Sequence, residues 1–285
     1  MVATRERFRW HRKPLSLIER LRLPCGGALP EKRLGGPCMS SEILTAHKGP
    51  VLEITLNRPQ TGNAASDAMA VELTKLLLGA GDTSEIVVLR SAGQDFCVGR
   101  ETMGKRPPGP PPEAFELRRR NDVVFNCYGA FRRCQIPVIG VVRGRAFGFG
   151  CAIAAVCDIT LAADTAKFQV PEMAHNIMPT MVMSALVDRV PRKAMTYLVW
   201  STAIIDPQRA REAGIVSEVL PEAELDRVVE ALCKQIMAAP RPARVGCKDY
   251  ARAALDMDVA GAIEFARSIH AVINSSSEML PAGHK

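Results

Sequence analysis

The chain has 285 residues, of which 47% are hydrophobic and 24% charged, and its net charge is +7. That length is enough for one large domain or two modest ones, and the composition is typical of a globular protein with a proper core. Residues 1–38 hold nine basic and three acidic side chains, so the remaining 247 residues, with 28 basic and 27 acidic ones, are nearly neutral. We therefore expect no nucleic-acid partner, and no apolar run is long enough to predict a membrane span.

Nine cysteines are spread along the chain without any C-x-x-C pair. The odd count, with several cysteines inside apolar segments, favours reduced thiols over a disulfide framework. We expect a cytoplasmic protein, or one of the mitochondrial matrix if the basic N-terminal segment is a transit peptide. Residues 1–44 are interpreted as a basic, disordered extension, and an upstream start codon is an alternative because Met39 directly precedes a well-formed domain.

Strands and helices alternate in the first two thirds of the sequence, and helices dominate the rest. Strands are expected over 51–56, 86–90, 137–142 and 159–163, and helices over 66–78, 113–133, 151–156, 181–190, 192–200, 222–238 and 247–278. Residues 205–219 should add a short helix and a brief strand, and the proline-rich residues 104–112 a mobile surface loop. This order predicts an α/β fold with a helical C-terminal subdomain.

Residues 144–172 carry the densest group of candidate functional residues. Glycines at 144, 148 and 150 lie between an apolar strand and a small apolar helix. Such glycines let backbone N–H groups approach a ligand at a helix N-terminus, although a tight turn alone explains the same pattern. A second strand then leads, after a proline, to the single carboxylate of Glu172. An anion-binding turn with one placed acid suggests chemistry on a polarised carbonyl group.

Several motifs follow one another in a recognisable order. They are Leu56-Asn57-Arg58-Pro59, the segment 95–100, the glycine cluster 144–150, Cys157-Asp158-Ile159, the segment 168–172, and Ala213-Gly214-Ile215-Val216 within 210–222. In this order the chain resembles the crotonase family, the enoyl-CoA hydratases and isomerases, over residues 45–278. The resemblance implies a crotonase-like spiral of ββα units over 45–200. It also implies a mainly helical part over 201–285 that packs in a homotrimer or a dimer of trimers.

The resemblance also implies the substrate and its binding residues. The substrate would be an acyl-CoA thioester, with CoA as part of the substrate, no separate cofactor and no metal. The backbone N–H groups of Arg100 and Phe149 would hold the thioester oxygen and stabilise an enolate. Phe149 stands where the family has glycine, so it should narrow the thioester pocket or redirect its wall. Substrate binding is further expected at Arg58, Val98, Glu101, Thr102, Met103 and Gly148.

The acid/base positions separate the reactions of the family. Its hydratases use two glutamates on either side of a water, and this chain has Ala152 at the first position and Glu172 at the second. A lone glutamate removes a proton from C2 and returns one to C4, which moves a double bond along the acyl chain. The pattern therefore favours the single-glutamate isomerases. Hydration with Glu101 as a substitute acid, and acyl-CoA binding without turnover, are the alternatives.

Other polar residues near the candidate site receive structural interpretations. His175 and Asn176 are expected in the core or at a helix cap, with a proton-donor or orienting role as the alternative. Asp158 is expected to fix the turn before the second strand. Cys97 and Cys151 flank the two proposed N–H donors. No histidine partner for them is evident in the sequence, so both are interpreted as small core residues.

Overall fold

We describe a computed structural model of the chain in residues 41–102, 109–110 and 112–280. These residues belong to one compact unit, Ser40–Lys285. Residues 1–40 of the expected extension and most of the loop expected at 104–112 lie outside the described residues. The first strand begins at Ile43, two residues before the expected start of the ββα core. In the described ranges, no helix is both long and apolar enough to cross a bilayer.

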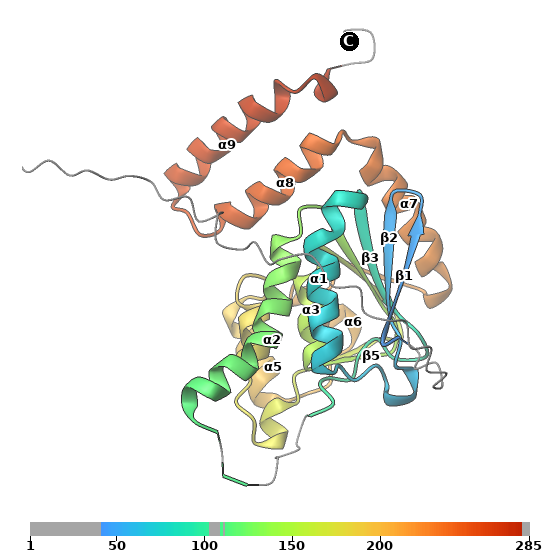
Figure 1. Cartoon of the computed structure of the whole chain (residues 1–285), viewed down its shortest axis with the longest axis vertical. Helices are drawn as coiled ribbons and strands as arrows, with labels where there is room; N and C mark the ends of the chain where they lie inside the picture. Colours follow the sequence, from blue (N-terminus) through green and yellow to red (C-terminus); the bar gives the residue numbers. More distant parts are fainter. Residues whose placement is uncertain (1–40, 103–108, 111, 281–285) are drawn as a thin grey trace, which may run out of the picture. The chain divides into compact units, whose positions relative to one another are not determined.

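A six-stranded sheet forms the centre of this unit (Figure 1). Its order is β1 (Ile43–Lys48), β2 (Val51–Leu56), β3 (Ile86–Ser91), β4 (Val138–Val142), β6 (Ile159–Ala163) and β8 (Glu218–Leu220). β1 runs antiparallel to β2, and every other neighbouring pair is parallel. The sequence did not predict β1, because this edge strand buries only Ile43 and therefore shows no alternating apolar pattern.

A second, two-stranded sheet pairs β5 (Arg145–Phe147) with β7 (Lys167–Gln169) in parallel. Single bridges extend it on both sides, since Cys97 pairs with Ala146 and Phe168 pairs with Ile205. The sequence did not predict these strands because three residues are too few to show a period of two. This small sheet positions the candidate site.

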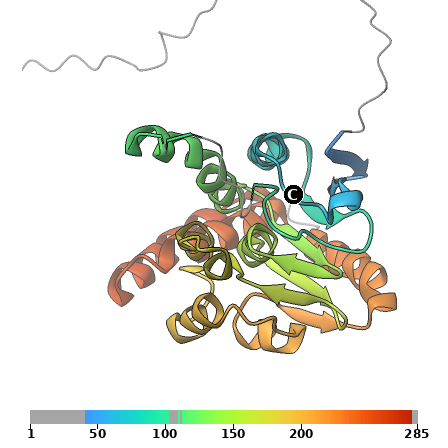
Figure 2. The same cartoon turned by 90° about the horizontal axis from the view of Figure 1, so that it is seen from below.

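The helices are α1 (Asp67–Thr83), α2 (Ala114–Arg133), α3 (Phe149–Val156), α4 (Thr180–Leu186), α5 (Arg192–Ser201), α6 (Pro207–Glu212), α7 (Leu225–Ala238), α8 (Arg241–Ala254) and α9 (Val259–Asn274). The expected helix over 247–278 is thus two helices. α1, α2 and α3 lie on one side of the six-stranded sheet and α7 lies on the other (Figures 1 and 2). Ser66 caps α1, as expected, by accepting a hydrogen bond of 2.9 Å from the N–H of Met69.

The hydrophobic core lies between the sheet and the helices. Every residue of the central strand β4 and of α3 is buried. A helix that is apolar on all sides is stable only inside a core, which explains the central place of α3. α1 instead buries one stripe, which includes Met69, Leu73 and Leu77, and leaves its opposite side to solvent.

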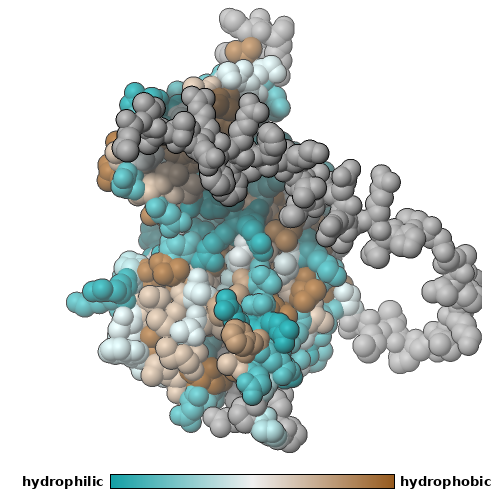
Figure 3. Space-filling view, turned by 60° about the vertical axis from the view of Figure 1, so that its left-hand side comes forward, coloured by the Kyte–Doolittle hydropathy of each residue, from teal (hydrophilic) through white to brown (hydrophobic). Residues whose placement is uncertain are grey.

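The last two helices form a pair in which α8 is anchored and α9 is exposed. Lys248 of α8 lies 2.7 Å from the carboxylate of Asp158, and the ring of Tyr250 stacks on Phe265 of α9 with centroids 5.7 Å apart. α9 buries no residue in the single chain. Hydrophobic residues also reach the surface in several patches on the face drawn in Figure 3. The expected packing in a trimer stays a prediction.

Candidate active site

Three expected site residues follow three parallel segments of the small sheet. Arg100 comes three residues after Cys97, Phe149 two residues after β5, and Glu172 three residues after β7. Cys97 pairs in parallel with Ala146 of β5, and β5 pairs in parallel with β7. The carboxyl ends of parallel strands lie at one edge of a sheet, so this pairing brings the three residues together.

Two glycines give the junction between β5 and α3 its shape. Gly148 has a φ of +50°, which L side chains rarely adopt, and its N–H donates a hydrogen bond of 2.9 Å to the carbonyl of Gln169. Gly150 packs so closely on the segment around Cys97 that a β-carbon there would lie 2.1 Å from the carbonyl oxygen of Cys97. The interpretation as a tight turn is therefore correct, and the approach of these backbone N–H groups to a ligand stays a prediction.

The N–H groups of Arg100 and Phe149 both point away from the hydrogen bonds that the preceding carbonyl groups accept. The carbonyl of Gly99 accepts a hydrogen bond of 2.8 Å from Ala65, and that of Gly148 accepts one of 2.9 Å from Ala152. In a trans peptide the following N–H points the opposite way, so the two amides face away from these partners. Neither donates a hydrogen bond to an acceptor in the described part of the chain. Amide donors without an acceptor, one of them at a helix N-terminus, are of the kind that can bind a negatively charged oxygen.

A cavity of about 390 Å³ lies beside these groups. Its lining includes four expected residues, Arg100, Thr102, Phe149 and Glu172. The other lining residues come from one face of α2, from the segment before α4 and from the first turn of α4: Leu117, Asn121, Val124, Phe125, Tyr128, Ile177, Met178, Pro179, Thr180, Met181 and Val182. The helical spacing of Val124 and Tyr128 was visible in the sequence, but this periodicity does not distinguish a cavity wall from core packing.

Glu172 is buried, with 6% of the residue exposed, and begins a short 3-10 helix over Glu172–His175. Burial raises the pKa of its carboxyl from 4.5 to about 7, and a backbone hydrogen bond partly opposes this shift. Its buried Oε2 atom has no hydrogen-bond partner among the described residues. A carboxyl group with a pKa near 7 in a cavity has the properties of a general base at neutral pH.

Ala152 lies on α3 with its side chain fully buried in the core. It does not line the cavity, and Glu172 is the only carboxylate among the described residues that do. The structure therefore places one acid beside the two outward-pointing amides.

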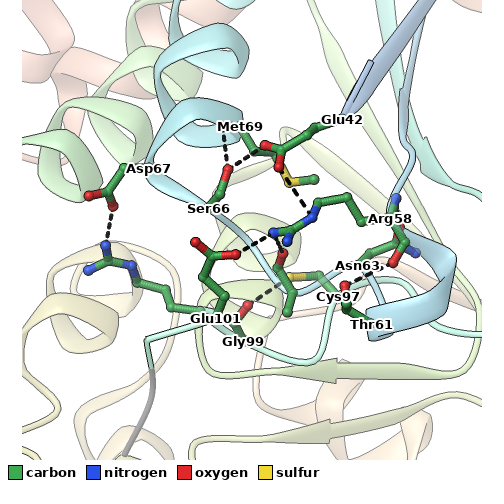
Figure 4. Close-up of polar contacts among 12 residues, drawn as sticks. Glu42, Arg58, Thr61, Asn63, Ser66, Asp67, Met69, Cys97, Gly99 and Glu101 are labelled. Carbon is green, nitrogen blue, oxygen red and sulfur yellow. Dashed lines mark hydrogen bonds and ion pairs between the residues drawn. The ribbon is translucent and has the colours of Figure 1, made fainter. Parts of the chain in front are cut away.

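Glu101 and Arg58 form an ion pair instead of lining the cavity (Figure 4). Nη1 of Arg58 lies 2.8 Å from Oε2 of Glu101, and its Nε lies 3.3 Å from Oε1 of Glu42. Nη1 also donates a hydrogen bond of 2.7 Å to the carbonyl of Ala64. The side chain of Glu101, 41% exposed, thus faces Arg58, which does not favour Glu101 as a substitute acid.

The remaining expected binding residues surround the site without lining this cavity. Val98 is half-buried and packs over Gly62, and Gly148 is the N-cap of α3. Met103 lies outside the described residues. The roles of these residues, and of Arg58 and Glu101, in substrate binding stay predictions.

Of the three polar residues expected to be structural, Asn176 and Asp158 have the expected roles and His175 does not. Asn176 caps the short helix of Glu172 in a left-handed conformation with a φ of +56°, as expected, but His175 is exposed and belongs to no core. Asp158 accepts a hydrogen bond of 2.8 Å from the N–H of Val138 at the start of β4, which confirms its structural role.

The two cysteines beside the proposed donors behave as core residues. Both Cys97 and Cys151 are fully buried, and burial raises the pKa of each thiol to about 12. A thiol with such a pKa stays protonated near neutral pH and is a poor nucleophile. This agrees with the interpretation of both as small core residues.

The side chains of Asn63 and Asp95 hold the segment that carries Arg100 in place. The sequence did not predict this role for either of them. Asn63 is fully buried, and its amide donates hydrogen bonds to the carbonyls of Ala92 (2.8 Å) and Asp95 (2.7 Å). The carboxylate of Asp95 accepts two hydrogen bonds from the guanidinium of Arg145 on β5, which lower the pKa of Asp95. Asp95 belongs to the motif over 95–100, but the sequence did not show that Arg145 is its partner.

Residues 46–281 match the family model described as enoyl-CoA hydratase/isomerase. The chain belongs to the enoyl-CoA hydratase/isomerase family. The expected membership of the crotonase superfamily and the expected α/β fold are thereby confirmed.

Individual relatives agree with this assignment. The 2,3-dehydroadipyl-CoA hydratase of Escherichia coli (strain K12) is 30% identical over 184 residues, which are 64% of this chain and 70% of the relative. A crystal structure of an enoyl-CoA hydratase from Mycobacterium smegmatis has a TM-score of 0.78 and 27% identity, covering 84% of this chain and 93% of that one. A protein of Thermobifida fusca YX, described as an enoyl-CoA hydratase and solved in complex with CoA, has a TM-score of 0.72 and 28% identity, with coverages of 81% and 92%.

Proposed function

We propose that the protein moves a double bond in an enoyl-CoA thioester, with Glu172 as the acid/base group. The observation that carries this proposal is one cavity lined by a single buried carboxylate, Glu172, together with Arg100 and Phe149, whose N–H groups have no acceptor in the described part of the chain. The family supports a CoA thioester as the substrate class, and so does the CoA complex of the Thermobifida fusca relative.

The chemistry assigns one task to each group. The N–H groups of Arg100 and Phe149 donate hydrogen bonds to the thioester oxygen, where negative charge develops as the enolate forms. The ionised carboxylate of Glu172 removes a proton from C2 of a 3-enoyl thioester. A proton added at C4 then gives the 2-enoyl product, and the thioester carbonyl is restored. CoA enters and leaves as part of the substrate, so the proposal needs no separate cofactor.

Hydration of a 2-enoyl thioester is the second candidate, because the relatives named above are described as hydratases. In the two-glutamate mechanism, one carboxylate activates the water and another supplies the proton. This chain has Ala152 at the first of these positions, and Glu101 is paired with Arg58. We therefore place isomerisation first. The homotrimeric assembly expected from the sequence is part of the proposal and not of its support.

An assay on two substrates tests this function. Purified protein is incubated with a 3-enoyl-CoA and with a 2-enoyl-CoA, and products are identified by mass spectrometry after chromatography. We expect conversion of the 3-enoyl to the 2-enoyl thioester and little hydration. Glu172→Gln should reduce the rate by at least about 100-fold, in line with loss of a general base. Glu212→Gln, on the exposed side of α6, is the matched control and should have no effect.

The same assay separates the alternatives. Full activity of Glu172→Gln would rule out the assigned base. Rapid hydration that disappears in Glu101→Gln would instead indicate a substitute acid. Binding of acyl-CoA in calorimetry without turnover of either substrate would support the alternative of a binding protein.

A further inference from the structure

Tyr128 places a phenol in the same cavity as Glu172. It lies on α2 with 2% of the residue exposed, and it lines the cavity together with Val124, one turn earlier on the same helix. No other phenol lines the cavity among the residues that the structure describes. The sequence showed Tyr128 only as part of an apolar helical stripe.

The ring of Tyr128 packs against the ring of Phe149, the residue whose backbone N–H is one of the proposed oxyanion donors. Its centroid lies 5.5 Å from that of Phe149, and the two ring planes are inclined by 34°. Phe149 replaces the glycine expected from the family pattern, so this contact depends on a departure from that pattern. A ring held on one face by a buried aromatic neighbour has few other positions to adopt.

The hydroxyl of Tyr128 has no hydrogen-bond partner in the described part of the chain. Tyrosine hydroxyls usually find a hydrogen-bond partner in the protein, in water or in a ligand. Oε2 of Glu172, in the same cavity, also has none among the described residues. Tyr128 and Glu172 line one cavity, so a polar ligand or a reacting group there can contact both.

We propose that Tyr128 is a catalytic residue that delivers the proton to C4 of the substrate while Glu172 removes the proton from C2. This inference rests on the proposed isomerase function and assigns its second step. The C2–H bond breaks and its proton goes to the carboxylate, while the electron pair moves into the dienolate. The dienolate then takes the hydroxyl proton of Tyr128 at C4, which leaves a phenolate. The carboxylic acid of Glu172 returns its proton to this phenolate, so no net proton is gained or lost.

The relative acidities of the two groups support the direction of the last transfer. Burial raises the pKa of Tyr128 well above its usual range, and the nearby charge of Glu172 raises it further. Cys127 and Cys97 act in the same direction, and Arg100 opposes them. The pKa of Glu172 is about 7, so a phenolate at Tyr128 is the stronger base and recovers the proton from Glu172.

Tyr128→Phe tests the proposal because it removes the hydroxyl and keeps the ring. Two rates are measured in D₂O on a 3-enoyl-CoA: exchange of the C2 hydrogens and conversion to the 2-enoyl product. We expect Tyr128→Phe to convert at least about 100-fold more slowly while C2 exchange stays within about threefold of the unaltered protein. Tyr250→Phe, on α8 outside the cavity, should change neither rate.

The outcomes distinguish this inference from the function on which it rests. Conversion by Tyr128→Phe within about threefold of the unaltered rate, with C2 exchange that depends on Glu172, would overturn the role of Tyr128 alone. Equal loss of exchange and conversion would reduce Tyr128 to a residue that shapes the cavity. If the unaltered protein neither exchanges C2 hydrogens nor converts substrate, the proposed function fails and the inference fails with it.

A label experiment on the unaltered protein is independent of how the variant folds. A substrate deuterated at C2 is mixed with an equal amount of unlabelled substrate in ordinary water. A single base that carries the same proton transfers deuterium from C2 to C4 within one molecule. We expect no such intramolecular transfer, because the proton at C4 comes from Tyr128. Substantial intramolecular transfer would overturn the proposal.

Discussion

The backbone of Gly150 lies so close to Cys97 that a β-carbon at residue 150 would stand 2.1 Å from the carbonyl oxygen of Cys97. That carbonyl also accepts a hydrogen bond of 2.9 Å from the N–H of Phe147 at the end of β5. The two contacts fix the segment that carries Arg100 against the helix that carries Phe149. The distance between the two proposed oxyanion donors therefore depends on the absence of a side chain at Gly150.

Gly150→Ala should damage both stability and activity. The new methyl group would meet a backbone oxygen that cannot move without shifting the donor segment, so we expect a loss of about 2–4 kcal/mol in the free energy of unfolding. Urea denaturation measures this change. Gly79→Ala is the matched control, because a β-carbon on this exposed residue of α1 meets no atom within 4 Å. It should stabilise the protein by about 0.5–1 kcal/mol. A Gly150→Ala protein as stable as the unaltered one would contradict the close approach.

The activity should rise with pH around neutrality. Glu172 must be ionised to accept a proton, and burial places its pKa at about 7. We therefore expect kcat/KM for a 3-enoyl-CoA to fall about tenfold for each pH unit below 7 and to level off above it. A profile measured between pH 5.5 and 8.5 checks this. A flat profile across that range would show that Glu172 is not the group whose ionisation limits the rate.

Glu172→Gln should stabilise the fold at alkaline pH. The folded-state pKa of about 7 lies above the ordinary value of 4.5, so the folded protein binds the proton more tightly than the unfolded chain does. The contribution of the Glu172 carboxyl to the free energy of unfolding is fully present below pH 4.5. This contribution is lost as the pH rises through 7. The neutral amide avoids this loss, and we expect a gain of about 1–3 kcal/mol at pH 8.

Thermal or urea unfolding at two pH values measures this difference. The advantage of Glu172→Gln should be present at pH 8 and absent at pH 4. A variant that is less stable than the unaltered protein at pH 8 would show that the carboxylate is not held at an energetic cost.

Arg58→Ala should destabilise the protein more than Glu101→Ala does. The guanidinium of Arg58 contacts Glu101, Glu42 and the carbonyl of Ala64, whereas the side chain of Glu101 is 41% exposed and contacts Arg58 (Figure 4). We expect losses of about 1–3 kcal/mol for Arg58→Ala and below about 1 kcal/mol for Glu101→Ala. Urea denaturation of both variants and of the double variant gives their coupling. The reverse order of the two losses would contradict this account.

Local sequence predicted the long elements well and the short ones poorly. The buried strand β4 and the capped helix α1 appear in the sequence as a continuous apolar run and as a helical stripe after Ser66. β5 and β7 left no such signal, because each has three residues and gains its structure from pairing with the other. The single bridge between Cys97 and Ala146 is equally invisible to local pattern, although it is part of what positions Arg100.

The sequence alone determined the family, the presence of Glu172 and the absence of an acid at Ala152. These follow from residue identities at fixed spacings along the covalent chain, which folding does not change. The tertiary structure decided which side chains share the cavity, because contacts between distant segments depend on strand pairing and helix packing. It turned Glu101 toward Arg58 and brought Tyr128 beside Phe149. It also buried Glu172, and the loss of water around that carboxyl raises its pKa to the range in which a base works at neutral pH.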